Sequence, residues 1–398
     1  MGNSVKHLLI ILSIFLFSFI SISCTSSSSS SSTTSTDNST IAFVGVGSAG
    51  TIVTSSDGTT MDTRTSGTTQ VLTSITYGNG LFVTVGSSGT ILTSTDGITW
   101  TIRTSGTGQS LYGVTYGNGT FVAVGAYEVI LSSTDGITWT DRSQGNDGNK
   151  TLLNITYGNG LFVTVGYQAV TYISSDGITW TYLNTRGSGI GNMMQGVTYG
   201  NGLYVSVGRY QQIIASDNGT TWTNKKTAGL DAEKWFNGVH YANGLYITVG
   251  SYGVMYSSSD GTTWTQMTSG ATEELREIAY GNSTYVVVGS NTILTSSDGT
   301  TWTERTSGTS EYLSGVTFGN GLFVTVSLGG TILTSSDGTS WDNRTSGTYN
   351  NFYGVTYGNG LFVTVGDSGT ILTSTDGTTW TEITSGTSET LKGVTYSQ

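Results

Sequence analysis

Short apolar segments alternate with turns of Gly, Asn and Asp along most of the chain, and the pattern recurs every 38 to 42 residues. In one copy it predicts strands over 112–116, 121–125 and 129–133, and a fourth strand that begins at Trp139. Val, Thr, Ile, Phe and Trp occupy these segments, as is typical of strands. Apolar side chains fall on both faces of the second strand, which indicates a sheet covered on both sides.

Two motifs mark this repeat. Tyr-Gly-Asn-Gly, or a near copy, follows the first predicted strand at 77–80, 116–119, 157–160, 199–202, 241–244, 280–283, 318–321 and 357–360. Ser-x-Asp-Gly-x-Thr-Trp, called the box below, joins the third strand to the fourth and occurs nine times when its variants are included. Four-stranded units of this period predict an all-β protein with a single closed β-propeller of about nine blades.

The two ends of the repeat array complement each other. The array begins at Ile41 in mid-repeat, with strands predicted over 43–47 and 51–55, and it ends at 391–396 with a first strand alone. We expect these ends to pair in the last blade, because closure of the ring removes exposed sheet edges. An open solenoid would need polar capping repeats, and the sequence carries none.

The first forty residues follow a different pattern. Lys6 and His7 precede an apolar run over 8–20, which is short for a membrane span and typical of a signal peptide. Residues 25–40 are nearly all Ser and Thr, a composition that predicts a flexible tether.

The junction at Ser23-Cys24 resembles a bacterial lipobox, in which the Cys is lipidated and becomes the mature N-terminus. Ser21 departs from that pattern, because Leu, Val or Ile usually stands there. The alternative is an ordinary signal peptide followed by an incidental Cys. We expect a signal peptide over 1–23, a tether over 24–40 that starts at a lipidated Cys24, and a propeller over 41–398.

Composition excludes several kinds of site. Charged residues are 10% of the 398 residues and the formal net charge is −11, which disfavours nucleic acid as a partner. A single Cys excludes an internal disulfide and a Cys-based metal centre, and two His leave little for histidine chemistry. We therefore expect neither a metal nor another cofactor.

The box resembles the Asp-box (BNR) repeat of sialidases, sortilin-type receptors and the photosystem II assembly-factor family, although it is one residue shorter than the common form. The resemblance covers about nine-tenths of the chain. It implies a propeller and leaves the function open, because those families share only the repeat.

A residue repeated around a ring is expected to be structural. An Asp before Gly in a hairpin accepts hydrogen bonds from its own turn, and the following Trp anchors that turn. We assign this structural role to Asp57, Asp96, Asp135, Asp176, Asn218, Asp260, Asp298, Asp337 and Asp376. The Arg at 64, 103, 142, 305 and 344 also recurs at one repeat position and is expected to be structural.

Ligand-binding residues are expected where the repeats differ. The box and the Tyr-Gly-Asn-Gly turn are constant, and both lie at one face of a propeller, so the variation belongs to the opposite face. Aromatic and long side chains gather there in consecutive repeats. The candidates are Tyr127, Glu128, Tyr167, Gln168, Arg186, Arg209, Tyr210, Gln211, Trp235 and Tyr252. The alternative is that these are solvated loops whose sequences have drifted.

Glu277 places a carboxylate on a first strand where other repeats have small residues, and a local pair with Arg276 is the simpler explanation. We expect an exported, lipid-anchored monomer at the outer membrane or cell surface that binds a protein or glycan and has no catalytic site. Alternatives are a glycosidase or sialidase-like enzyme, and an assembly or quality-control factor resembling the photosystem II family.

Overall fold

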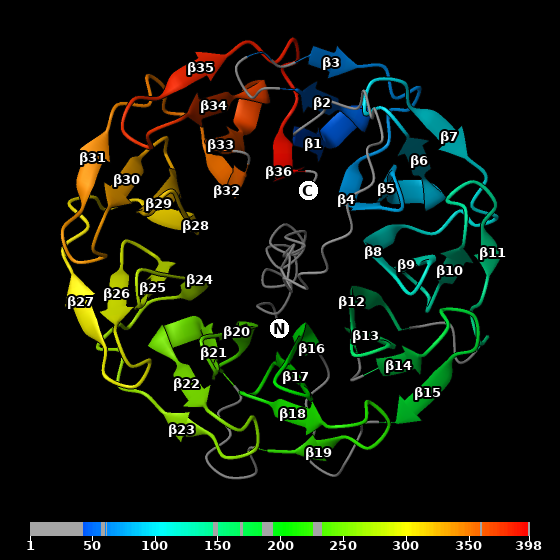
Figure 1. Ribbon diagram of the computed structural model, residues 1–398, viewed down its shortest axis with the longest axis horizontal. Coiled ribbons are helices and arrows are strands. Elements are labelled where there is room, and N and C mark those ends of the chain that lie inside the picture. Colours follow the sequence, from blue (N-terminus) through cyan, green and yellow to red (C-terminus); the bar gives the residue numbers. More distant parts are fainter. Residues whose placement is uncertain are drawn as a thin grey trace, which may run out of the picture.

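Each repeat folds into four antiparallel strands, because β-branched and aromatic residues favour pleated, covered segments and Gly or Asn permits the turns between them. The structure is a computed structural model that describes residues 43–56, 60, 62–145, 150–167, 170–184, 194–225, 233–358 and 360–396. Among these residues the strands form nine four-stranded sheets. The sheets stand as blades around a central axis, with one strand of each nearest the centre (Figure 1).

The first and second strands of each repeat form the inner half of a blade. The innermost strands are β4 (Leu72–Gly78), β8 (Leu111–Gly117), β12 (Leu152–Gly158), β16 (Met194–Gly200), β20 (Phe236–Ala242), β24 (Leu275–Gly281), β28 (Tyr312–Gly319), β32 (Phe352–Gly358) and β36 (Leu391–Tyr396). The second strands are β1 (Phe43–Gly47), β5 (Leu81–Gly86), β9 (Thr120–Gly125), β13 (Leu161–Gly166), β17 (Leu203–Gly208), β21 (Leu245–Gly250), β25 (Thr284–Gly289), β29 (Leu322–Leu328) and β33 (Leu361–Gly366).

The third and fourth strands form the outer half. The third strands are β2 (Ile52–Ser55), β6 (Ile91–Ser94), β10 (Ile130–Ser133), β14 (Val170–Ser174), β18 (Ile213–Ser216), β22 (Met255–Ser258), β26 (Ile293–Ser296), β30 (Ile332–Ser335) and β34 (Ile371–Ser374). The fourth are β3 (Asp62–Arg64), β7 (Thr101–Arg103), β11 (Thr140–Asp141), β15 (Thr181–Asn184), β19 (Thr223–Asn224), β23 (Thr265–Gln266), β27 (Thr303–Arg305), β31 (Asp342–Arg344) and β35 (Thr381–Ile383). Single 3-10 turns are η1 (Ser48–Gly50), η2 (Ser87–Gly89), η3 (Ser251–Gly253) and η4 (Asp367–Gly369).

Blade 1 joins the two ends of the array, as predicted. Its strand order is β3-β2-β1-β36, and β36 pairs antiparallel with β1 through Phe43 opposite Tyr396 and Val44 opposite Thr395. Blades 2 to 9 each take four consecutive strands, from β4–β7 to β32–β35. The prediction of a closed ring of nine blades is therefore confirmed.

The core lies between the blades. Phe43 and Val53 of blade 1 share a buried cluster with Val363 of blade 9, and Val44 of blade 1 shares another with Phe82 of blade 2. Each sheet is therefore covered on both faces, as the apolar residues of the second strands predict. Neighbouring blades also approach closely at the first Gly of the Tyr-Gly-Asn-Gly turn. A Cβ on Gly117 of blade 3 would lie 2.2 Å from the ring of Tyr157 in blade 4, so a larger residue would not fit there. No helix in the described part of the chain is long and apolar enough to cross a membrane.

Candidate functional site

The two ends of the blades form two different faces. The Tyr-Gly-Asn-Gly turns lie beside the boxes, since Asn118 Nδ2 donates to the carbonyl of Ser175 at 3.2 Å. The loops between second and third strands lie instead beside the connections between blades, since the Glu128 N–H donates to the Lys150 carbonyl at 3.0 Å. We call the first the box face and the second the variable face.

The box is a self-contained turn. Asp135 Oδ1 accepts the backbone N–H groups of Thr138 and Ile137 at 2.8 Å and the hydroxyl of Ser133 at 2.9 Å. The N–H groups of Thr138 and Ile137 lower the pKa of Asp135 to about 2. Trp139 Nε1 donates to the carbonyl of Gly136 at 3.0 Å. These bonds engage the carboxylate within the turn, which is the geometry expected of a structural group.

Equivalent carboxylate or amide bonds to backbone N–H groups form in seven other boxes, at Asp96, Asp176, Asn218, Asp260, Asp298, Asp337 and Asp376. Asp57 lies outside the described residues. In the part of the chain that the structure describes, no three His, Cys, Asp or Glu residues come together as a group that could hold a metal ion.

The variable face carries bulky residues in strained backbone. Tyr127, Tyr210 and Tyr252 have φ of 55°, 58° and 52°, at the position that Ala49 or Ser88 occupies in other blades. A left-handed conformation is costly for such side chains, and strain of this kind concentrates at functional sites. Tyr127 and Tyr252 are 57% and 55% exposed. The fold therefore holds two large aromatic side chains in solvent at a conformational cost.

A hollow of about 300 Å³ adjoins one of these tyrosines. It is lined by Glu233, Lys234, Tyr252, Ala271 and Thr272. The ring of Trp235 meets that of Tyr252 nearly edge-on, with centroids 6.4 Å apart and planes at 72°.

The same region extends into blades 4 and 5. The backbone of Trp235 bridges to that of Arg209. Burial raises the pKa of Tyr167, and the positive charge of Arg209 in the next blade acts in the opposite direction. The structure thus brings Tyr167, Arg209, Trp235 and Tyr252 into one region across three blades.

The remaining candidates lie elsewhere. Glu128 and Gln211 are 1% and 3% exposed, so their side chains face the interior and do not line the open surface. Tyr210 is half-buried. Gln168 and Arg186 fall outside the described residues. Tyr349, which was not among the candidates, is 94% exposed in the connection between blades 8 and 9.

Glu128 belongs to a buried network that the repeat analysis missed. Its Oε1 lies 3.1 Å from Lys150 Nζ, and its Oε2 accepts the hydroxyl of Tyr172 at 2.9 Å. The Lys150 ammonium also lies 4.7 Å from the ring centroid of Tyr182. Burial alone would lower the pKa of Lys150, but the hydrogen bond and charge of Glu128 outweigh it and raise that pKa. The sequence feature that could have indicated this network is Tyr172, which occupies the position of Leu92 in blade 2 and Leu131 in blade 3.

Glu128 occupies a loop position that is Gly in other blades. In blade 6 the same loop position is Gly253, where a Cβ would come within 2.0 Å of the Ala271 carbonyl. Blade 3 carries Glu128 at this position, and the connection that faces it is longer there: nine residues over 143–151, against seven over 104–110 in blade 2. The longer connection brings Lys150, so the steric change and the ion pair arise together.

Glu277 lies on the innermost strand of blade 7. Burial raises its pKa to about 7, although the charge of Arg276 and the N–H of Val316 act in the opposite direction. The guanidinium of Arg276 lies 5.5 Å from the ring centroid of Tyr312 in blade 8. The Tyr312 hydroxyl donates to Glu274 at 2.8 Å. These groups form a polar cluster near the start of the innermost strands, on the side of the variable face.

A family model and one solved structure, described first, support the fold. Residues 269–384, which span blades 7 to 9, match the family model described as the DUF6242 beta propeller domain. The computationally designed Ika8 protein is similar over 76% of this chain and 95% of its own, with a TM-score of 0.57 and 13% identity. YCF48 bound to D1 peptide aligns over 59% and 81% (TM-score 0.44, 20% identity), and YCF48 from Cyanidioschyzon merolae over 76% and 94% (TM-score 0.48, 17% identity). No curated protein matches the chain.

Proposed function

We propose that this chain is an exported, lipid-anchored binding protein that recognises a protein surface with its variable face. The observation that carries the proposal is the set of tyrosines held exposed in left-handed backbone, next to the hollow at Tyr252 and the ring of Trp235. Tyr, Trp and Arg are the residues that dominate binding energy in protein interfaces.

A protein ligand accounts for the breadth of the region better than a small molecule does. The candidate residues extend from Tyr167 in blade 4 to Trp235 at the start of blade 6, whose backbone bridges to Arg209, and Tyr127 adds blade 3. The hollow presents both Glu233 and Lys234, which favours a partner surface of mixed charge. A glycan is the alternative ligand for this face, and an assembly-factor role would use the same surface.

We assign no catalytic role to Glu128 or Glu274, because both carboxylates are bonded within the fold. Glu128 is bonded to Lys150 and Tyr172. Glu274 accepts Asn237 Nδ2 at 2.8 Å as well as the Tyr312 hydroxyl. Acid–base catalysis needs a group placed to exchange a proton with substrate, and these carboxylates are engaged internally.

The position of Phe43 bears on how an anchored propeller is oriented. β1 begins at Phe43 opposite Ser55, the residue at which the box starts, so the chain enters the propeller from the box face. The expected tether over 24–40 would span at most about 60 Å when extended. An anchor at Cys24 would therefore be joined to the propeller at its box face, on the side opposite the variable face.

Site-specific photocrosslinking tests the binding face. A photoreactive amino acid at Tyr127 or Tyr252 is expected to trap a defined protein partner in the cells that produce the chain. The same group at Thr262, an exposed box residue on the opposite face, is the matched control. Truncation of Tyr252 to Ala is expected to weaken binding of that partner by about 1–3 kcal/mol without changing the melting temperature. Crosslinks of equal yield from Thr262 would show that the wrong face was chosen.

Metabolic labelling tests the anchor. Cells given a labelled fatty acid are expected to label the parent chain and not the Cys24→Ala variant. Equal label in the two proteins would exclude lipidation at Cys24 and would leave the binding face untouched.

A further inference from the structure

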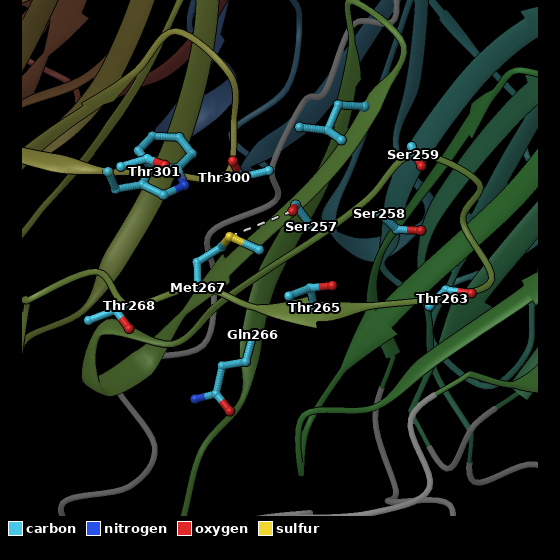
Figure 2. Close-up of a pocket in the computed structure, with 12 residues that line it drawn as sticks. Ser257, Ser258, Ser259, Thr263, Thr265, Gln266, Met267, Thr268, Thr300 and Thr301 are labelled. Atoms are coloured by element: carbon cyan, nitrogen blue, oxygen red, sulfur yellow. Dashed lines mark hydrogen bonds between the residues drawn. The ribbon is translucent and has the colours of Figure 1, made fainter.

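A groove of about 670 Å³ lies between blades 6 and 7, away from the variable face and lined mainly by the outer strands and boxes of these blades. Figure 2 shows Met267 and Ser257 between a wall that carries Thr300 and Thr301 and a segment that carries Thr265 and Gln266. Leu245, Ser258, Ser259, Thr263, Thr268 and Trp302 complete the lining. Its size is within the range of ordinary ligand sites.

The groove opens where blade 6 departs from the repeat. In five blades the corresponding residue is Arg, whose Nε donates to a hydroxyl on the third strand, as Arg103 does to Thr93 at 2.7 Å. Blade 6 has Met267 instead, and the Ser257 hydroxyl lies 3.7 Å from its sulfur. Met267 therefore lacks the guanidinium that reaches the third strand in those five blades, and this difference coincides with the groove between blades 6 and 7.

A second departure lies on the blade 7 side of the groove. The indole N–H groups of seven other box tryptophans donate to the carbonyl of the Gly three residues earlier, as Trp264 does to Gly261 at 3.0 Å. Trp302 Nε1 is buried and has no hydrogen-bond partner among the residues that the structure describes. A buried donor without an acceptor is costly, and an acceptor from a ligand would remove that cost after a small shift of the ring.

The lining selects for an uncharged, hydroxyl-bearing ligand. Eight of its twelve residues are Ser or Thr, one is Gln, and none is ionisable. Hydroxyl groups both donate and accept, so they suit a ligand whose own groups do both. Met267, Leu245 and Trp302 add apolar surface against which a CH face can pack. A charged ligand would be desolvated here without a counter-charge.

We infer that this groove is a binding site for a neutral oligosaccharide. Sugar rings combine hydroxyl edges with CH faces and carry no charge. The Ser and Thr hydroxyls of the groove suit the former, and Leu245, Met267 and Trp302 suit the latter. An extended peptide is the less suitable occupant, because β23 pairs with β22 over two residues only and offers a short free edge for strand addition. The groove shares no residue with the variable-face candidates, so this inference does not depend on the proposed function.

The chain itself supplies the decisive variant. Met267→Arg restores the residue that five blades carry, and it should fill the groove while keeping the fold. Ile383→Arg is the matched control, because Ile383 occupies the same position in blade 9, with Thr373 placed to accept the new side chain as Thr93 does. Trp302→Phe keeps a ring and removes the N–H group.

The full-length chain, in a detergent without a sugar headgroup, is titrated calorimetrically with neutral oligosaccharides of glucose, xylose, mannose or N-acetylglucosamine, and with uronic-acid oligosaccharides as the charged comparison. We expect saturable binding of at least one neutral series, loss of it in Met267→Arg, retention in Ile383→Arg, and roughly three- to tenfold weaker binding in Trp302→Phe. Thermal melts establish that each variant is folded.

Three results would overturn the inference: no neutral series binds the parent chain, Met267→Arg binds as the parent does, or Ile383→Arg loses binding equally. If Met267→Arg does not fold, unchanged affinity in Trp302→Phe is the overturning result. Preference for the uronic-acid series would also contradict a neutral site.

Discussion

Removal of the Lys150 ammonium should destabilise the propeller more than most single substitutions. The Lys150→Met variant keeps the apolar stem and leaves the Glu128 carboxylate buried, since the side chains of Lys150 and Glu128 are 6% and 2% exposed. Loss of one partner of a buried ion pair costs about 3–5 kcal/mol, because the remaining charge is uncompensated. The hydroxyl of Tyr172 remains as a donor, which places the expected loss nearer the lower value.

The double variant Glu128→Met, Lys150→Met separates the ion pair from the packing. Apolar replacement of both members of a buried pair is often neutral or stabilising. We therefore expect the double variant to lie within about 2 kcal/mol of the parent and to be more stable than Lys150→Met alone. The second substitution would then offset part of the stability lost through the first, a non-additive effect that is typical of residues in contact.

Urea unfolding followed by tryptophan fluorescence measures these differences. The midpoint should shift while the slope stays constant, since the same surface is exposed. Lys225→Met, which removes a partly exposed lysine, is the control and should change the free energy of unfolding by less than about 0.5 kcal/mol. A loss below about 1 kcal/mol in Lys150→Met, or a double variant no more stable than the single one, would refute the reasoning.

The same pair predicts behaviour in alkali. The pKa of Lys150 is raised in the folded chain, so its stabilisation is complete below the ordinary lysine pKa and is lost as pH rises through the folded value. The parent should therefore lose stability in strong alkali more steeply than the double variant does.

Three further predictions concern the ring. Deletion of 391–398 removes β36 from blade 1, and we expect aggregation or a large fall in melting temperature; a deletion variant that melts like the parent would argue against closure through β36. Asp135→Ala should lower stability by about 1 kcal/mol at neutral pH and less in acid: the folded pKa is depressed, so the contribution of Asp135 is present above its ordinary pKa and is lost as pH falls toward 2. Glu277 has a raised pKa, so Glu277→Gln should stabilise the chain by about 1–3 kcal/mol above pH 7, and the gain should vanish below the ordinary pKa of a glutamate; denaturant titrations at several pH values measure both effects.

The repeat pattern was sufficient to predict the architecture. The strands, the turns and the complementary ends of the array are local or periodic features, and the pairing of Phe43 with Tyr396 follows from counting strands. Interaction among identical units leaves few alternative arrangements, because each four-stranded unit must bury both faces against its neighbours. The segregation of constant and variable loops onto two faces follows from the same strand order.

The side chains on the variable face were less predictable. Tyr127 and Glu128 are neighbours in a variable loop, yet the first is 57% exposed and the second 1% exposed. Both residues have positive φ, and this turn directs consecutive side chains in different directions. Glu128 is the buried residue of the two because it bonds to Lys150, twenty-two residues later, and to Tyr172 in the next blade. No motif marks Lys150 or Tyr172.

The groove at Met267 was also invisible to the repeat pattern. Met267 replaces Arg just after the fourth strand of blade 6 and is marked by no motif, and Trp302 belongs to a box that is complete in sequence. Only the packing of blade 6 against blade 7 brings the two together and leaves space between them. The sequence by itself therefore determined the periodic backbone and its closure, because these depend on local propensity and on the number of strands. The tertiary structure decided which side chains are buried, strained or facing open space, because those properties depend on contacts between residues of different blades.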